Sequence, residues 1–149
     1  MGPAAAEAGK RGVRIALENW FSTCLQNLDH FAAVVEALPE SVGFNFDPSH
    51  LCWQEIDYLA AVKEFAPRIY HTHAKDTAVD AAALRRKGVL ERGWWRYVIP
   101  GFGIVDWGQY IGALRLAGYD RVLSVEHEDR AFEAEEGFER AIAFLSRFV

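Results

Sequence analysis

Hydrophobic residues recur along the chain in two arrangements: short unbroken runs, and positions three or four residues apart. Unbroken runs are typical of buried strands, and the wider spacing is typical of amphipathic helices. The runs predict four strands, over residues 13–17, 42–46, 69–73 and 121–125. The wider spacing predicts helices over residues 28–38, 54–65, 107–117 and 132–148, and an Ala-rich segment predicts another over residues 3–10.

Residues 77–105 fit neither arrangement, apart from a short helix expected over residues 81–86. The rest of this segment is rich in glycine and aromatic residues, and a loop this long inside a compact domain is usually functional or disordered. The aromatic residues argue against disorder. Trp94 and Trp95 fit the wall of a sugar pocket and a hydrophobic plug on the rim of the fold equally well.

Helices and strands otherwise alternate strictly, which predicts an α/β fold with a parallel sheet. The predicted strands are short and largely apolar, as expected for strands covered on both faces. The sequence contains no linker or low-complexity segment. We therefore expect residues 1–149 to form a single domain.

The composition is that of a soluble globular protein, with 51% hydrophobic and 25% charged residues. A net charge of −5 argues against a nucleic-acid partner. No apolar run approaches the ~18 residues of a membrane span, and residues 1–12 lack the apolar core of a signal peptide. Cys24 and Cys52 have no pairing motif and are expected to be reduced thiols. These features predict a cytoplasmic protein without a membrane partner.

The predicted strands all end in a carboxylate or imidazole side chain, at Glu18, Asp47, His73 and Glu126. In a parallel α/β barrel the carboxyl ends of the strands form the rim on which active sites lie, so these four side chains are expected to face one centre. Any one of them, taken alone, is more commonly a helix cap or a solvated charge. Their shared position favours a metal site. Strand alternation places three further polar residues on the same inward face: Asn45, His71 and Ser124.

Three carboxylates and one imidazole form a hard ligand set, which favours Mn²⁺, Mg²⁺ or Co²⁺ over a closed thiolate zinc site. We expect one divalent ion, Mn²⁺ in the first place, with Zn²⁺ as a further alternative. Such an ion polarises a substrate carbonyl as a Lewis acid. Glu18 and Glu126 would then move a proton on either face of the neighbouring carbon.

Five short blocks of sequence occur in the order seen in one superfamily. They are Leu17-Glu18-Asn19, Asn45-Phe46-Asp47-Pro48-Ser49-His50, His71-Thr72-His73-Ala74-Lys75-Asp76, Pro100-Gly101-Phe102-Gly103 with Val105-Asp106-Trp107, and Ser124-Val125-Glu126-His127-Glu128. With these blocks the chain resembles the sugar phosphate isomerase/epimerase family, the xylose isomerase-like TIM barrels. Relatives there include ketose 3-epimerases, inosose-processing enzymes, hydroxypyruvate isomerases and apurinic endonucleases. The blocks span essentially the whole chain and are specific for the superfamily but not for a substrate.

The resemblance implies that the four strand-end residues are metal ligands and that Glu18 and Glu126 are the acid/base pair. It implies that His50 contacts substrate in some members and metal in others. Lys75 and Arg96 lie where basic residues would contact the substrate.

A complete barrel of this kind has eight βα units, and this chain resembles the last four. We therefore expect a half-barrel of the TIM type, beginning inside what would be the fourth helix. A half-barrel leaves two open sheet edges, which favour association. The sequence leaves open a truncated product, a fragment, a partner half-barrel on another chain, or two copies that close a barrel around a two-fold axis.

The function expected first is a metal-dependent isomerase or epimerase that acts on a sugar, polyol or sugar phosphate by proton transfer next to a carbonyl. The alternative is a non-catalytic fragment or subunit of a split barrel. An apurinic endonuclease-like hydrolase fits less well, because those enzymes use a basic DNA-binding face and extra histidine ligands from the absent half. A dinucleotide-binding loop at Gly101 and Gly103 is disfavoured, because Asp106 stands where the third glycine would be.

Overall fold

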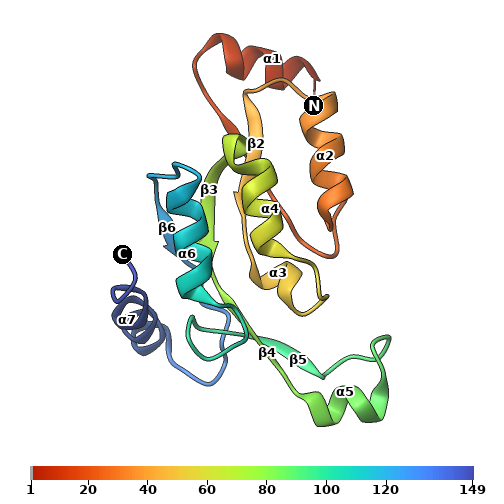
Figure 1. Ribbon diagram of the computed structural model, residues 1–149, viewed down its shortest axis with the longest axis vertical. Helices are drawn as coiled ribbons and strands as arrows, with labels where there is room; N and C mark the ends of the chain where they lie inside the picture. Colours follow the sequence, from red (N-terminus) through yellow and green to blue (C-terminus); the bar gives the residue numbers. More distant parts are fainter. Residues whose placement is uncertain (1) are drawn as a thin grey trace.

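The computed structural model describes residues 2–149, which form a four-stranded parallel sheet and a separate two-stranded antiparallel hairpin (Figure 1). The parallel sheet has the order β1-β2-β3-β6, and the hairpin pairs β4 with β5. The strands are β1 (Ile15–Glu18), β2 (Val42–Phe46), β3 (Ile69–Ala74), β4 (Asp76–Val79), β5 (Trp95–Val98) and β6 (Leu123–Val125). The expected α/β fold with a parallel sheet is confirmed.

Helices connect successive strands of the parallel sheet and lie along one of its faces (Figure 1). In chain order, the helices are α1 (Gly2–Lys10), α2 (Leu28–Ala37), α3 (Ser49–Cys52), α4 (Tyr58–Phe65), the 3-10 helix η1 (Ala66–Arg68), α5 (Ala81–Lys87), α6 (Trp107–Leu116) and α7 (Ala134–Leu145). Of these, α1 precedes β1, α5 lies between the two hairpin strands, and α7 follows β6. Several begin at a side chain that accepts hydrogen bonds from N–H groups of the first turn, as N-caps do; these caps are Asn27, Asp57, Asp80 and Asp106.

The largest difference from the sequence-based prediction lies in residues 77–105. The short helix expected there is α5, but it is flanked by two strands that pair with each other, from Asp76↔Val98 to Val79↔Trp95. The helix separates the two strands by some fifteen residues of sequence, so the usual signature of a tight hairpin is missing. The predicted helix over 54–65 also begins later, at Tyr58, where the Asp57 side chain caps it.

The two faces of the parallel sheet differ in character. Phe44 and Phe46 of β2 pack into the core under the helices, where Phe31 of α2 lies 4.6 Å from Phe44 and 5.4 Å from Phe65, between ring centroids. In β1, burial alternates: Leu17 packs against this core, while Glu18 is exposed on the opposite face. Because strand side chains alternate between faces, the helices seal one side of the sheet and leave polar residues on the other.

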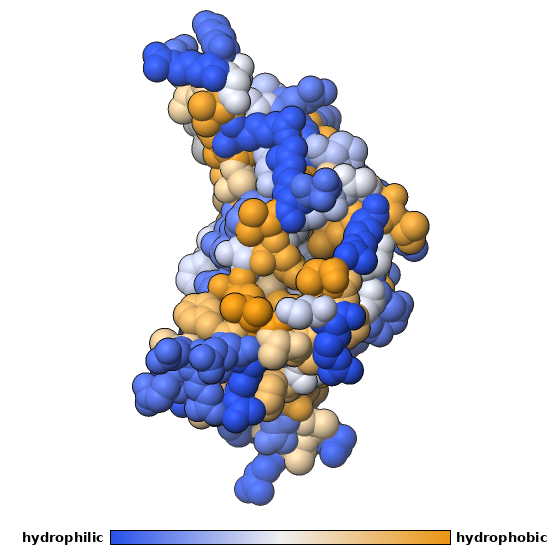
Figure 2. All heavy atoms as spheres, turned by 90° about the vertical axis from the view of Figure 1, so that its left-hand side faces the viewer, coloured by the Kyte–Doolittle hydropathy of each residue, from blue (hydrophilic) through white to orange (hydrophobic). Residues whose placement is uncertain are grey.

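β1 and β6 are the two edges of the parallel sheet in the part of the chain that the structure describes. Figure 2 looks onto the α6, β6 and α7 side and shows hydrophobic side chains gathered across its middle. The exposed large hydrophobic residues of α6, α7 and the turn before β6 are Leu116, Val122, Phe138 and Ile142. An open edge beside exposed apolar side chains is the surface expected of a half-barrel. None of the helices within residues 2–149 has the length and apolar character needed to cross a membrane.

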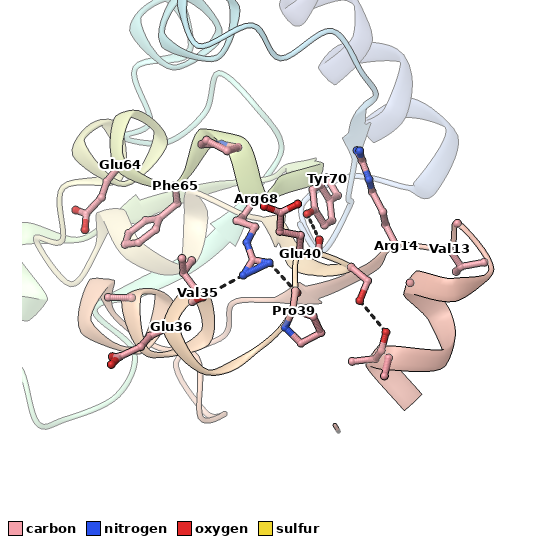
Figure 3. A pocket seen from close by; sticks show the side chains of 17 residues that line it. Val13, Arg14, Val35, Glu36, Pro39, Glu40, Glu64, Phe65, Arg68 and Tyr70 are labelled. Carbon is pink, nitrogen blue, oxygen red and sulfur yellow. Dashed lines mark hydrogen bonds between the residues drawn. The ribbon is translucent and has the colours of Figure 1, made fainter. Parts of the chain in front are cut away.

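A hollow of about 1000 Å³ lies at the other end of the strands, between α1, α2 and the segments that precede β1, β2 and β3 (Figure 3). Arg68 lies beside it and is 8% exposed. Its guanidinium group donates hydrogen bonds to four carbonyl oxygens around the C-terminus of α2 and the start of β2, those of Val35, Leu38, Pro39 and Val42. This arrangement satisfies carbonyl groups that a helix end leaves unpaired. We assign this end of the sheet to stability, as is usual for the amino ends of barrel strands.

Candidate metal centre

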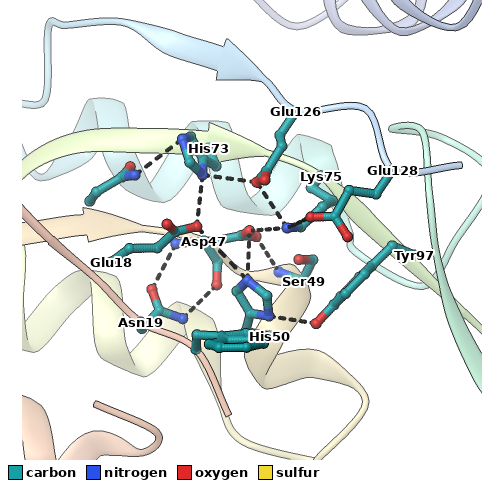
Figure 4. Close-up of polar contacts among 12 residues, drawn as sticks. Glu18, Asn19, Asp47, Ser49, His50, His73, Lys75, Tyr97, Glu126 and Glu128 are labelled. Atoms are coloured by element: carbon teal, nitrogen blue, oxygen red, sulfur yellow. Dashed lines mark hydrogen bonds and ion pairs between the residues drawn. The ribbon is translucent and has the colours of Figure 1, made fainter. Parts of the chain in front are cut away.

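The four strand-end residues expected from the sequence lie together at the carboxyl ends of the parallel strands (Figure 4). Glu18, Asp47, His73 and Glu126 each offer one ligand atom, and these atoms all lie within 4.8 Å of one another. They come from β1, β2, β3 and β6 or the residue directly after the strand. The cluster therefore draws on every strand of the parallel sheet.

Asp47 is the fully buried member of the cluster. The Asn19 side chain holds its backbone, because the amide oxygen accepts from Asp47 N at 2.8 Å and the amide nitrogen donates to Asp47 O at 2.9 Å. One carboxylate oxygen, Oδ1, accepts from Ser49 N at 2.8 Å, while the other, Oδ2, has no hydrogen-bond partner although it is buried. Burial raises the pKa of Asp47 to about 6, although the charge of Lys75 opposes the rise. A buried carboxylate oxygen without a partner is costly unless a cation or donor satisfies it.

His73 contacts two glutamates, the exposed Glu18 and the half-buried Glu126. Its Nδ1 lies 3.1 Å from Glu18 Oε1 and 3.0 Å from Glu126 Oε2, while Nε2 lies 3.1 Å from the Asn45 amide nitrogen. The hydrogen bond to Glu126 is the main cause of a raised pKa for His73, and the same bond is the main cause that lowers the pKa of Glu126 to about 2. His73 therefore presents Nδ1 to the carboxylates and Nε2 to Asn45.

Asn45 contacts the ring nitrogen of His73 that faces away from the carboxylates. If His73 held a metal ion through Nδ1, its ring proton would reside on Nε2 and would need an acceptor. The Asn45 amide oxygen is buried without a partner, and rotating the amide end for end brings it to Nε2. Such a partner orients the imidazole and raises its basicity as a ligand.

We predict that Asn45→Ala weakens binding of Mn²⁺ by roughly 10–100-fold, the usual effect of removing the outer partner of a ligating histidine. Isothermal titration with Mn²⁺ measures the change. Asn45→Asp is the matched variant, because it retains an acceptor oxygen and is expected to keep most of the affinity. An Asn45→Ala protein with unchanged affinity would show that Asn45 does not support His73.

Lys75 is buried among the carboxylates, with 1% of its side chain exposed. Its Nζ lies 2.8 Å from Glu126 Oε2, 3.1 Å from Glu128 Oε1 and 3.4 Å from Asp47 Oδ2. Burial lowers the pKa of Lys75, but these carboxylates outweigh burial and raise it overall. Lys75, expected from the sequence as a substrate contact, is thus placed beside the ligand carboxylates rather than on an open surface.

The other two expected substrate contacts, His50 and Arg96, have different surroundings. His50 is 3% exposed, and its Nε2 lies 3.3 Å from Asp47 Oδ2 and 4.0 Å from Glu18 Oε1. Burial is the main cause that lowers the pKa of His50 to about 3. Arg96 lies on β5, where its NH1 donates to Asp129 Oδ1 at 2.6 Å while 59% of its side chain stays exposed.

An aromatic cluster adjoins His50. Phe21 lies 6.3 Å from the His50 ring, 5.4 Å from Trp53 and 5.5 Å from Trp95, between ring centroids. Trp95 stacks on Trp53 at 4.3 Å, while Trp94 is only 4% exposed. The sequence allowed either tryptophan to be a hydrophobic plug or part of a pocket wall. Trp94 is the buried plug, and Trp95 belongs to the aromatic cluster beside His50.

Several residues of the site were not predicted from the sequence as site residues. Asn19 stands next to Glu18, and this adjacency is a signal that could have indicated its role. Tyr97, Phe21 and Trp53 gave no comparable signal, because they come from a hairpin, a loop and the end of a short helix that converge only in the folded chain.

The residues present fit a divalent cation. Three carboxylates and an imidazole are a hard donor set suited to ions that prefer oxygen ligands. The donors lie within 4.8 Å of one another, and the Asp47 Oδ2 atom is buried without a hydrogen-bond partner. Glu18, Asp47, His73 and Glu126 are the residues that would hold the ion.

A parallel sheet with helices on one face, and with acidic and histidine side chains gathered at its carboxyl ends, defines half of a TIM-type barrel with a rim site. The family model described as xylose isomerase-like TIM barrel matches residues 1–148. The chain belongs to this family.

Among curated proteins, the chain is 30% identical over 146 residues to the uncharacterised protein YfiH of Bacillus subtilis, covering 91% of this chain and 47% of YfiH. It is 27% identical to an inosose dehydratase of Geobacillus thermodenitrificans, covering 81% of this chain and 42% of that protein. The chain thus spans about half the length of the curated relatives that it matches.

Two solved structures share this fold, and in each the matching part is about half of the solved chain. The IOLI protein with a bound zinc atom has a TM-score of 0.74 and 23% identity, covering 97% of this chain and 53% of that one. The probable 3-DHS dehydratase AsbF of Bacillus anthracis has a TM-score of 0.75 and 18% identity, covering 95% of this chain and 52% of that one. These likenesses confirm that the chain has the fold of half a barrel.

Proposed function

We propose that this chain carries the metal centre of a divalent-metal-dependent isomerase or epimerase that acts on a sugar, polyol or sugar phosphate. The observation that carries the proposal is the approach of Glu18, Asp47, His73 and Glu126 to within 4.8 Å. We expect Mn²⁺ as the ion, with Mg²⁺, Co²⁺ and Zn²⁺ as alternatives. The zinc atom in the related IOLI structure supports a divalent ion at a site of this fold.

The chemistry that a bound ion supplies is polarisation of the substrate carbonyl, which acidifies the neighbouring C–H bond. In the chain itself, Glu18 and Glu126 have side chains that are 42% and 31% exposed, so a substrate can reach both. In our proposal one glutamate accepts the proton from the carbon next to the carbonyl. In an epimerisation the other donates a proton to the opposite face of the same carbon and inverts it. In an isomerisation a proton is delivered instead to the former carbonyl carbon, and the carbonyl moves to the neighbouring carbon, whose hydroxyl gives up its proton.

The remaining site residues take supporting roles in this proposal. Lys75 bonds Glu126 and Glu128 and so holds them against the cluster. His50 and Arg96 contact substrate hydroxyl or carbonyl oxygens. Trp95 supplies an apolar face against which the C–H side of a sugar ring packs.

A dehydratase is the second candidate, because the chain matches inosose dehydratases over 81% of its length. The first step is shared: a glutamate takes the proton next to the carbonyl. In dehydration the neighbouring C–O bond then breaks, a C=C bond forms, and the hydroxyl leaves as water with a proton from an acid group. The two reactions therefore diverge only after the proton has been removed.

The test is exchange of substrate hydrogen with D₂O by the Mn²⁺-loaded protein, using an inosose and a ketose. We expect deuterium at the carbon next to the carbonyl. If dehydration occurs, we expect a product whose mass is lower than that of the substrate by one water molecule. Glu126→Gln is expected to slow exchange by about 100-fold or more, since a general acid or base contributes roughly 10²–10⁴-fold. Glu128→Gln is the control, because Glu128 lies outside the group of four close donors.

A protein that binds Mn²⁺ but exchanges no hydrogen with either substrate would contradict the catalytic proposal. That result would favour the alternative, a non-catalytic fragment or subunit of a split barrel.

We further propose that the β1 and β6 edges are covered in the working molecule, by a partner half-barrel or a second copy of this chain. The exposed apolar residues beside β6 support this proposal. Light scattering gives the mass, and a monomer at all concentrations would contradict a second copy. The two free cysteines, Cys24 and Cys52, support the expected cytoplasmic location.

A further inference from the structure

Tyr97 contacts both of the groups outside the ligand set that approach the buried oxygen of Asp47 (Figure 4). Its hydroxyl oxygen lies 2.7 Å from His50 Nδ1, and Lys75 Nζ lies 4.5 Å from the centre of its ring. His50 Nε2 and Lys75 Nζ in turn lie 3.3 and 3.4 Å from Asp47 Oδ2. Tyr97 of the β4–β5 hairpin therefore contacts two groups that both approach Asp47.

The surroundings of His50 determine which ring nitrogen carries the proton. A neutral imidazole has one N–H group and one lone pair on its two ring nitrogens, and His50 is 3% exposed. Nε2 faces carboxylate oxygens, Asp47 Oδ2 at 3.3 Å and Glu18 Oε1 at 4.0 Å. A lone pair on Nε2 would be repelled by these oxygens, whereas an N–H group is attracted to them. The carboxylates therefore favour the form with the proton on Nε2.

Nδ1 must then accept a hydrogen bond, and Tyr97 supplies it. Burial raises the pKa of Tyr97, so the hydroxyl keeps its proton and can donate it. The 2.7 Å distance from the hydroxyl oxygen to Nδ1 is that of a well-formed hydrogen bond. The Tyr97 and His50 rings also meet edge to face at 5.2 Å, which limits rotation of the imidazole.

We propose that Tyr97 is a positioning residue that fixes His50 in the form protonated at Nε2 and so keeps His50 out of the ligand set of the metal. A nitrogen that carries a proton cannot bind a metal ion. His50 instead presents an N–H donor beside Asp47, where it contacts an oxygen of the substrate. The substrate contact rests on the proposed function, whereas the protonation pattern does not.

The opposite arrangement would place the proton of His50 on Nδ1. If Tyr97 accepted a hydrogen bond from Nδ1–H, the lone pair of Nε2 would be free to become a fifth ligand. In this structure His50 lies outside the group of four donors that are mutually close. Tyr97 therefore separates two kinds of site built from the same Asp47 and His50.

The experiment is long-range ¹H–¹⁵N correlation NMR on protein labelled with ¹⁵N-histidine, with and without Zn²⁺, which is diamagnetic. His50→Gln assigns the His50 signals. We expect Nε2 to carry the proton and Nδ1 to show the shift of a hydrogen-bond acceptor, in both samples. A proton on Nδ1 in the Zn²⁺-loaded protein would overturn the proposal, because Nε2 would then be free to bind the metal.

Tyr97→Phe removes the hydroxyl and keeps the ring under Lys75. Without the donor, the carboxylates alone favour Nε2–H, so His50 is expected to populate its other neutral form in part and its two nitrogen shifts are expected to move toward each other. Trp95→Phe is the matched control, because it alters a neighbouring ring 5.1 Å away and leaves the Tyr97 hydroxyl in place. Unchanged His50 shifts in Tyr97→Phe, or an equal change in Trp95→Phe, would show that the hydroxyl does not fix the ring.

Measuring the exchange of substrate hydrogen with D₂O by the same protein distinguishes a failure of this inference from a failure of the proposed function. A proton on Nε2 that depends on the Tyr97 hydroxyl supports the inference even where no substrate hydrogen exchanges. Exchange activity with a proton on Nδ1 contradicts the inference and leaves the proposed function standing.

Discussion

Replacing Asp47 with asparagine is expected to reduce the affinity for Mn²⁺ by at least about 100-fold. Loss of an outer partner of a ligand alone costs roughly 10–100-fold, and Asp47 is itself a donor of the cluster. Its Oδ2 atom is buried without a close hydrogen bond, and His50 Nε2 and Lys75 Nζ approach it at 3.3 and 3.4 Å, so the oxygen has room to bind an ion. Asparagine keeps the shape of the side chain but lacks the negative charge that attracts a hard cation.

Isothermal titration with Mn²⁺ measures the effect, with Glu128→Gln as the control. Glu128 also contacts Lys75, at 3.1 Å, so its replacement tests the change in charge near the cluster without removing a proposed ligand. We expect Glu128→Gln to bind Mn²⁺ within a few-fold of the unaltered protein, because Glu128 is not one of the four donors that lie within 4.8 Å of one another. Equal affinities for the Asp47→Asn and Glu128→Gln proteins would rule out Asp47 as a ligand.

The second large effect is expected at Asp76, where one buried carboxylate accepts five hydrogen bonds. Its Oδ1 accepts from the backbone N–H groups of Thr77 and Val105, and its Oδ2 accepts from Gly101 N, Gly103 N and the Trp107 indole at 2.9 Å. Burial raises the pKa of Asp76, and these donors oppose the rise. The carboxylate thus ties the start of β4 to the loop that leads into α6.

Asp76→Asn is expected to lower the free energy of unfolding by about 3 kcal/mol. Hydrogen bonds to a charged group contribute roughly 1.5–3 kcal/mol each, and a buried donor left unpaired costs about 1–3 kcal/mol. The amide has one acceptor oxygen, so its NH₂ end faces N–H groups that it cannot satisfy. Urea unfolding followed by circular dichroism measures the loss.

Asp80→Ala is a suitable comparison, because Asp80 is an exposed N-cap that accepts from two backbone N–H groups of α5. Loss of such a cap typically costs about 1 kcal/mol. If Asp76→Asn cost no more than Asp80→Ala, the five hydrogen bonds would not be holding the loop. A larger loss at Asp76 together with altered His50 shifts would link this anchor to the position of Tyr97.

Much of the site is readable from the sequence because it depends on local order. Each of Glu18, Asp47, His73 and Glu126 follows or ends a short apolar strand, and parallel strands end at one edge. Their approach to one another therefore follows from the alternation of helices and strands. The metal assignment itself stays a prediction that titration will test.

The contacts around those four residues could not be read in the same way. The β4–β5 hairpin pairs strands separated by α5, and the hydrogen bond from Tyr97 to His50 joins residues that are 47 positions apart. The placement of Lys75, buried beneath three carboxylates instead of facing solvent, depends on where Glu126 and Glu128 arrive after β6. Such contacts are set by packing between distant segments, which periodicity does not encode.

By itself, the sequence determined the parallel α/β order, the half-barrel length and the four side chains at the strand ends, because hydrophobic period and strand direction are local properties. Only the tertiary structure decided the partners of those side chains. The Asn19 side chain hydrogen-bonds the backbone of Asp47, the Asn45 amide contacts His73 Nε2, and the Tyr97 hydroxyl contacts His50 Nδ1. The protonation and orientation of buried groups follow from their nearest neighbours, and folding alone brings those neighbours together.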